Sequence, residues 1–256
     1  RMRMPIKYLL TASICSILAL PAAANNNTTE GNVNTWSLLL NRFYLSDKFT
    51  FTNEIHERSG AFLKDQSTFI IRPSIDFALN KDIELSVGYS FLHFTPYEPY
   101  TLAISRNEHN IWEQAMLKSK VGNVTVQHRF RFEHRFLQTI KKETLTEDYY
   151  LDGYTYSNRF RYRLIVMFDI LKLNDKKHSI FFHGFDELWI NQADNMMPTS
   201  YARNWIYTGL GYKFNRDFNI QLGHMRQQDK INDNTFISSS IIQLSVFKNF
   251  TLYNRK

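Results

Sequence analysis

The stretch VTVQHRFRFEHRF, residues 124–136, alternates polar and apolar side chains at most of its positions. A helix turns about 100° per residue and would scatter the arginines around its circumference, whereas a strand points successive side chains to opposite faces. One face of such a strand carries the polar residues Thr125, Gln127, Arg129, Arg131, Glu133 and Arg135. The stretch therefore predicts a β-strand with one polar face, and with an apolar face that contacts either a protein core or lipid.

The first 24 residues have the features of a secretory signal peptide. Three basic residues precede an apolar run at residues 8–20 (YLLTASICSILAL), and an A-x-A cleavage site follows at residues 22–24. The apolar run is shorter than the roughly 20 residues that a membrane-spanning helix needs. We therefore expect residues 1–24 to be removed on export, and residues 25–256 to form one domain.

Charge and cysteine content argue against a nucleic-acid partner and against disulfide chemistry. The formal net charge is +7, and residues 1–24 contain three basic and no acidic residues, so the mature chain carries +4. The single cysteine, Cys15, lies inside the apolar run of the signal peptide. An exported chain with this modest charge is not expected to bind nucleic acid, and the mature part has no thiol.

The same alternation recurs along most of the chain after residue 34. Although the mean hydropathy is −0.38, aromatic residues make up 15% of the chain. In a membrane barrel, polar residues that face the lumen alternate with apolar residues that face lipid. The mean hydropathy of such a chain is therefore as low as that of a water-soluble protein. Eleven segments show the pattern: 34–45, 49–58, 67–79, 83–94, 111–120, 124–136, 156–170, 179–190, 203–214, 218–228 and 236–247.

The connections between these segments alternate in length. Short polar turns at 46–48, 80–82, 122–123 and 215–217 alternate with longer links such as 95–110 and 137–155. This pattern is typical of an antiparallel transmembrane β-barrel with short periplasmic turns and longer extracellular loops. Bacterial barrels have even strand numbers, so we expect 10 or 12 strands and prefer 12. An up-and-down soluble barrel of the lipocalin type remains the alternative.

Aromatic residues lie near the ends of these segments, as in the interfacial girdles of membrane barrels. The residues concerned are Phe43, Tyr44, Phe49, Phe91, Phe94, Phe136, Phe214 and Phe218.

Four stretches and the opening Trp36 resemble a family of small Gram-negative outer-membrane barrels, the domain of unknown function number twenty-four ninety. The stretches are HRFRFEHRF (128–136), NRFRYRL (158–164), FDELWIN (185–191) and RNWIYTGLGYKFNRDFNIQLGHM (203–225). The resemblance covers roughly residues 36–250. It implies a barrel fold and an outer-membrane location, and it implies no activity.

Two arginine ladders, on segments expected to be neighbours, dominate the polar face. They either form a path for anions or brace a narrow barrel through pairs with carboxylates, and buried charge favours the pairing. We expect Glu133 to be the main partner, with Arg131 and Arg135 flanking it on its own face and Arg161 as the candidate across from it. We also expect the long side chains to fill most of the bore. The predicted lumen-facing network is Glu54, Arg72, Asp76, Arg129, Arg131, Glu133, Arg135, Arg159, Arg161, Arg163 and Glu187.

No pattern predicts a catalytic, metal or cofactor site. His128 and His134 are expected on the outward face, where their strand offers no serine or threonine to act as a nucleophile. His183 and Glu187 share one strand face, but a metal site needs three or four ligands. We therefore expect no catalytic residue, no metal and no cofactor.

Three classes of function follow from the sequence. The first is a narrow or constricted outer-membrane pore with an arginine-lined lumen, whose partners are outer-membrane lipid and a small anionic solute. The second is a structural or adhesive barrel that presents its extracellular loops. The third is a barrel enzyme that acts on lipid or peptide, for which the sequence offers no recognisable constellation.

Overall fold

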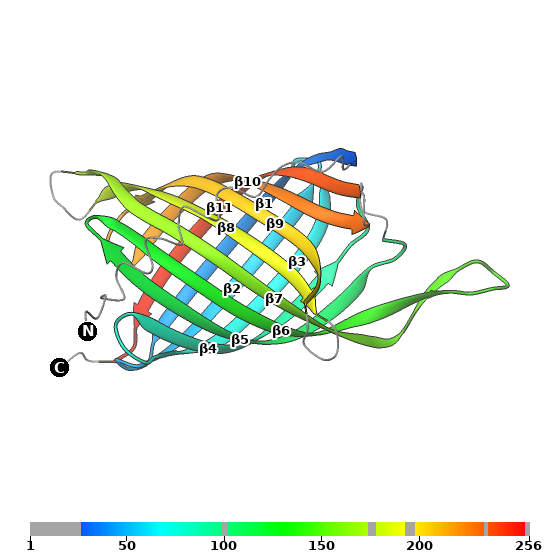
Figure 1. The fold of residues 1–256 in the computed structure, drawn as a ribbon, viewed down its shortest axis with the longest axis horizontal. Coiled ribbons are helices and arrows are strands. Elements are labelled where there is room, and N and C mark those ends of the chain that lie inside the picture. Colours follow the sequence, from blue (N-terminus) through cyan, green and yellow to red (C-terminus); the bar gives the residue numbers. More distant parts are fainter. Residues whose placement is uncertain (1–26, 99–101, 174–177, 193–197, 233–234, 254–256) are drawn as a thin grey trace, which may run out of the picture.

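The computed structural model describes residues 27–98, 102–173, 178–192, 198–232 and 235–253, so the expected signal peptide lies outside the described residues. Their regular structure consists of strands alone, which close into one barrel (Figure 1). Within these ranges there is no helix long and apolar enough to span a membrane. The strands are β1 (Asn27–Tyr44), β2 (Phe49–Gly60), β3 (Asp65–Ala78), β4 (Ile83–Phe94), β5 (Arg106–Val121), β6 (Val124–Lys142), β7 (Tyr149–Lys172), β8 (Ser179–Gln192), β9 (Pro198–Lys213), β10 (Phe218–Asn232) and β11 (Thr235–Thr251).

The barrel closes with an odd number of strands. Every strand pairs antiparallel with its sequence neighbours, and the ring is completed by a parallel pairing of β1 with β11, in which Tyr44 lies opposite Thr251. The eleven described strands match the eleven segments counted in the sequence, and the preferred number of twelve is not confirmed. The even-number rule fails here because the first and last strands run in the same direction and still form a ladder.

The predicted short turns are present at one end of the barrel, whereas one predicted long loop is not a loop. β5 and β6 are joined by two residues, of which Gly122 adopts a φ of +62° that favours glycine. The predicted loop at residues 137–155 is mostly strand, because Gln138 pairs with Tyr154 and Lys142 with Tyr149. The ends of β6 and β7 therefore form a hairpin that projects beyond the other strands (Figure 1, green).

Side chains alternate between an apolar outer face and a polar inner face, as the pattern predicts. On β6, Phe130 is 36% exposed on the outside while its neighbour Arg131 is 2% exposed inside. Phe94, which we assigned to an outer girdle, instead lines the interior. Exposed apolar side chains occur around the ring and include Leu39, Phe49, Ile71, Ile75, Leu85, Val87, Ile111, Phe136, Ile206, Leu210, Leu222, Ile242 and Leu244.

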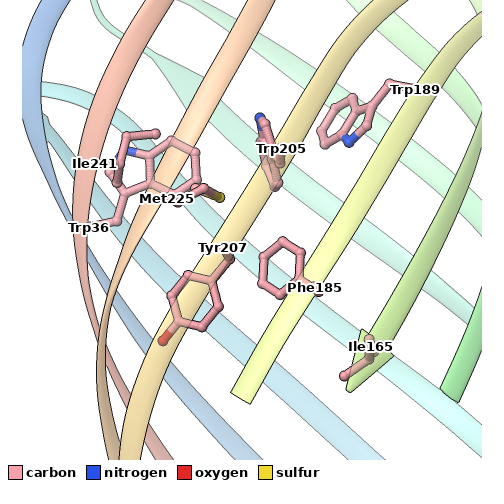
Figure 2. Close-up of a cluster of buried hydrophobic side chains, with 8 residues drawn as sticks. All are labelled: Trp36, Ile165, Phe185, Trp189, Trp205, Tyr207, Met225 and Ile241. Carbon is pink, nitrogen blue, oxygen red and sulfur yellow. The ribbon is translucent and has the colours of Figure 1, made fainter. Parts of the chain in front are cut away.

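The interior also holds aromatic rings, which pack over glycines in the barrel wall. Gly88 lies directly opposite Trp112, and a Cβ atom at Gly88 would overlap the indole ring. Farther round the ring, Trp205 lies between Trp36 and Trp189 (Figure 2). The cluster around them consists of Trp36, Ile165, Phe185, Trp189, Trp205, Tyr207, Met225 and Ile241. The barrel is thus partly filled on one side by an apolar core.

Candidate functional site in the lumen

A cavity of about 1030 Å³ runs along the inside of the barrel. Side chains from all eleven described strands line it, from Asn123 and Asn219 near the turn end to Tyr97 and Leu137 near the loop end. The side chains therefore narrow the bore and leave an elongated space, where we had expected them to fill most of it.

The eleven residues of the predicted network all lie on the inner face. Nine of them line the cavity, and Glu133 and Glu187 lie behind the arginines, where they are 1% and 0% exposed. The two ladders on β6 and β7 are neighbours, since Arg129 lies opposite Arg163 and Arg131 opposite Arg161.

Glu187 binds three arginines at once. It lies directly opposite Arg163, whose Nη2 is 2.5 Å from Oε2. The other carboxylate oxygen, Oε1, accepts Nη2 of Arg129 at 2.5 Å and Nη2 of Arg161 at 2.8 Å. These charge-assisted bonds are the strong kind, and they tie together side chains from β6, β7 and β8. Glu187 is thus the most heavily shared carboxylate among the described residues, a role the sequence did not reveal.

Glu133 binds one of the three arginines that we predicted for it, and one that we did not. Its Oε1 accepts Nη1 of Arg161 at 2.7 Å, and its Oε2 accepts Nε of Arg159 at 2.6 Å. The predicted contact with Arg161 across the strands is confirmed, whereas the prediction that Arg131 and Arg135 bind Glu133 is wrong. Residues two apart on one strand are separated by about 6.6 Å along it, whereas facing residues on adjacent strands are about 5 Å apart. An arginine on the neighbouring strand is therefore closer to Glu133 than Arg131 or Arg135 is.

The two displaced arginines bind side chains of β5 instead. Arg135 donates Nε and Nη2 to the two oxygens of Glu108, at 2.8 and 2.6 Å, in a bidentate pair. Arg131 donates Nε and Nη2 to the neutral amide oxygen of Gln114, at 3.0 and 2.8 Å. The sequence missed Glu108 because it precedes the segment that we assigned to this strand, which in fact begins at Arg106.

A smaller set of pairs occupies the wall formed by β1 to β4. Glu54 and Arg72 face each other across β2 and β3 and form an ion pair at 2.8 Å. Asp76 accepts bonds from Thr52 at 2.5 Å and from Ser74 at 3.1 Å. The Glu54–Arg72 and Thr52–Asp76 contacts are cross-strand pairs of the kind that stabilise a sheet, whereas Ser74 and Asp76 both lie on β3.

All four tryptophans of the chain line this cavity, and sequence reasoning did not place them there. A guanidinium lies over three of them at 3.8–3.9 Å: Arg58 over Trp36, Arg131 over Trp112 and Arg161 over Trp189. Each tryptophan lies an even number of residues from a lumen-facing charged residue on its own strand, as Trp189 does from Glu187, and therefore points to the same face. This even spacing is the sequence signal that could have placed the tryptophans in the lumen.

The two histidines of β6 lie on the outer face next to tyrosines. His128 and His134 point outward, and their Nδ1 atoms lie 2.8 Å from the hydroxyls of Tyr162 and Tyr156. The described ranges contain no group of three residues that could hold a metal ion.

A family model described as a protein of unknown function (DUF2490) matches residues 33–237. No curated protein matches the chain. The matched region begins in β1, ends in β11 and contains the entire arginine network described above.

Proposed function

The chain belongs to the DUF2490 family of proteins of unknown function, and from the lumen we propose that it is an outer-membrane β-barrel whose constricted, arginine-lined pore passes small anions. The observation that carries the proposal is the cavity lined from one end of the barrel to the other, with arginines along its middle.

The outer surface supports insertion into a membrane. The described strands are 12 to 24 residues long, enough to cross a bilayer when tilted, which takes about 9–11 residues. Exposed apolar side chains surround the ring, and such a belt is costly in water. Aromatic contacts lie at its turn end, where Phe43 stacks on Phe250 at 4.8 Å and Phe214 on Phe218 at 5.0 Å. The residues 1–24 that we expect to direct export agree with this location.

The location is the first expected outcome. Because the outer face is apolar, the full chain should fractionate with outer membranes. Because the strands form a closed barrel, the chain should migrate differently on gels before and after heating. Recovery as a soluble periplasmic protein after cell breakage would exclude the membrane reading and leave the lipocalin-type barrel.

Charge in the lumen supports anion selectivity. Three arginines share the single carboxylate of Glu187, and Arg131 is bonded to a neutral amide. A low-dielectric wall with surplus fixed cations attracts anions and repels cations. The long side chains also narrow the passage, so the current through one molecule should be small.

The second expected outcome is a small, anion-preferring conductance of the refolded chain in planar bilayers, read from the reversal potential in a KCl gradient. Arg106 lines the cavity near the loop end, so Arg106→Gln should reduce the anion preference. Arg226 is exposed on the outer face, so Arg226→Gln is the matched control and should leave the preference unchanged. A large, steady, cation-selective current would contradict a constricted anion pore.

The projecting hairpin favours a second candidate, a barrel that presents an adhesive element. Its tip exposes Leu145, Tyr149, Tyr150 and Tyr154, and aromatic side chains of this kind are common at protein contacts. Absence of any conductance from the correctly folded protein would favour this candidate over the pore. The third class, a barrel enzyme, gains no support from the outward histidines, which are bonded to tyrosines.

A further inference from the structure

Arg58 on β2 is a buried cation for which the described residues provide no carboxylate. Its side chain lines the cavity, the residue is 9% exposed, and its Nε has no hydrogen-bond partner. The guanidinium lies 3.8 Å from the ring centre of Trp36 and 5.4 Å from that of Trp205. The indole nitrogen of Trp205 also lacks a hydrogen-bond partner.

Arg131, on β6, repeats this arrangement. It is 2% exposed, lies 3.9 Å from the ring centre of Trp112, and binds only the neutral Gln114, so its Nη1 has no partner. The interior therefore holds two buried arginines, each stacked on tryptophan and each with an unused N–H group.

The charges nearest to these two arginines are largely other arginines. Arg72 and Arg161 repel the charge of both Arg58 and Arg131, and Arg203 adds to the repulsion at Arg58. Arg161 lies opposite Arg131 and, like Arg58, lies over the ring of Trp205, so Arg58 and Arg131 border one region of the lumen. The cation–π contacts recover less free energy than the burial of an unpaired charge costs. Buried polar groups nearly always have a hydrogen-bond partner, so these unused N–H groups call for one from outside the chain.

We infer that the middle of the lumen binds an organic anion, a carboxylate or phosphate attached to a ring or apolar body. Arg58 and Arg131 contact the anionic oxygens, and Trp36, Trp112 and Trp205 contact the body. Every unused group named above is a hydrogen-bond donor, so the complement is a ligand rich in acceptors. The cavity of about 1030 Å³ has the size of a small-molecule site. The inference rests on the proposed function only for the ligand's route of entry.

Calorimetry on the refolded full chain in detergent tests the ligand class. Phenyl phosphate and phenylacetate carry both features, benzyl alcohol lacks the charge, and inorganic phosphate lacks the body. We expect the first two to bind at least tenfold more tightly than the last two. Equal binding of benzyl alcohol would overturn the role of charge, and equal binding of inorganic phosphate would overturn the role of the body. Because all four tryptophans line the cavity, binding there should also change their intrinsic emission.

Arg58→Met tests the residue. Methionine keeps an apolar stem over Trp36 and removes the charge, and it leaves no carboxylate without its partner. We expect phenyl phosphate affinity to fall at least tenfold while the unfolding midpoint stays the same or rises, since an unpaired buried charge is removed. Arg226→Met, on the outer face, is the matched control for the affinity, which it should leave unchanged.

Two further outcomes keep the inference separate from the pore. If Arg58→Met fails to fold, Arg58 is a structural residue and the inference is wrong for it; Arg131→Gln then tests the remaining half by the same affinity loss. Anion conductance without binding of either aromatic anion would overturn the binding site and leave the pore intact. Binding without conductance would support the site and remove the pore.

Discussion

Replacing Glu187 by glutamine is expected to destabilise the barrel by about 3–5 kcal/mol, because it leaves three buried arginines without their shared counter-charge. Removal of one partner from a buried charge cluster costs far more than the cluster contributes relative to an apolar core. Glutamine keeps the size and one acceptor oxygen, so the loss reports charge and not volume. Among the described residues, Arg129 and Arg163 form no ion pair other than the one with Glu187, which leaves little room for compensation.

Urea unfolding of the protein refolded into lipid vesicles measures this effect, with emission of the four interior tryptophans as the signal. The matched control is Glu143→Gln, at the exposed tip of the β6–β7 hairpin, which should change stability by less than about 0.5 kcal/mol. A change at Glu187 as small as that control would mean that the arginines are hydrated or are neutralised by bound ions.

Phe132→Arg is expected to cost roughly 2–4 kcal/mol in a bilayer, since an arginine on the lipid face near the midplane must lose its hydration. Phe132 lies on the outward face of β6, one residue from Glu133 on the lumen side. The conservative Phe132→Leu should cost less than about 1.5 kcal/mol, because it keeps the site apolar. The two variants are compared by the same vesicle unfolding assay. A loss below about half a kcal/mol for Phe132→Arg would mean that this face contacts water or protein, and would weigh against insertion in a membrane.

Strand identity and strand face were readable from the sequence because both depend on a period of two, which local residues record. Arg131 and Phe130 were placed correctly on opposite faces of β6 for this reason. Strand ends were less readable, since hairpin residues such as Tyr149 and Lys142 pair with each other without facing a core. The polar exposed side chains there resemble those of a loop.

The ion-pair partners within the lumen could not be predicted from the alternation alone. The alternation shows that a residue points into the barrel, but it does not give the register of its strand against the next one. Glu133 was expected to bind Arg131 and Arg135 on its own strand and Arg161 across from it. The register of β6 against β7 instead brings Arg159 directly opposite, and only Arg161 of the expected three binds Glu133. Arg58 illustrates the same limit for a residue that has no carboxylate partner among the described residues. It is absent from the predicted network, because nothing in the sequence shows that no acidic residue of the described ranges binds it.

The parallel contact of β1 with β11 also determines the sidedness of the chain. β1 starts at Asn27 on the rim of the long loops, and β11 ends at Thr251 on the rim of the short turns. In an even-numbered barrel both ends share one rim. In the orientation proposed above, the amino-terminal end of β1 must be translocated across the bilayer during assembly, while the carboxy-terminal end stays on the side of entry. A peptide fused directly before Asn27 would then be displayed outside the cell, and one fused after Thr251 would remain in the periplasm.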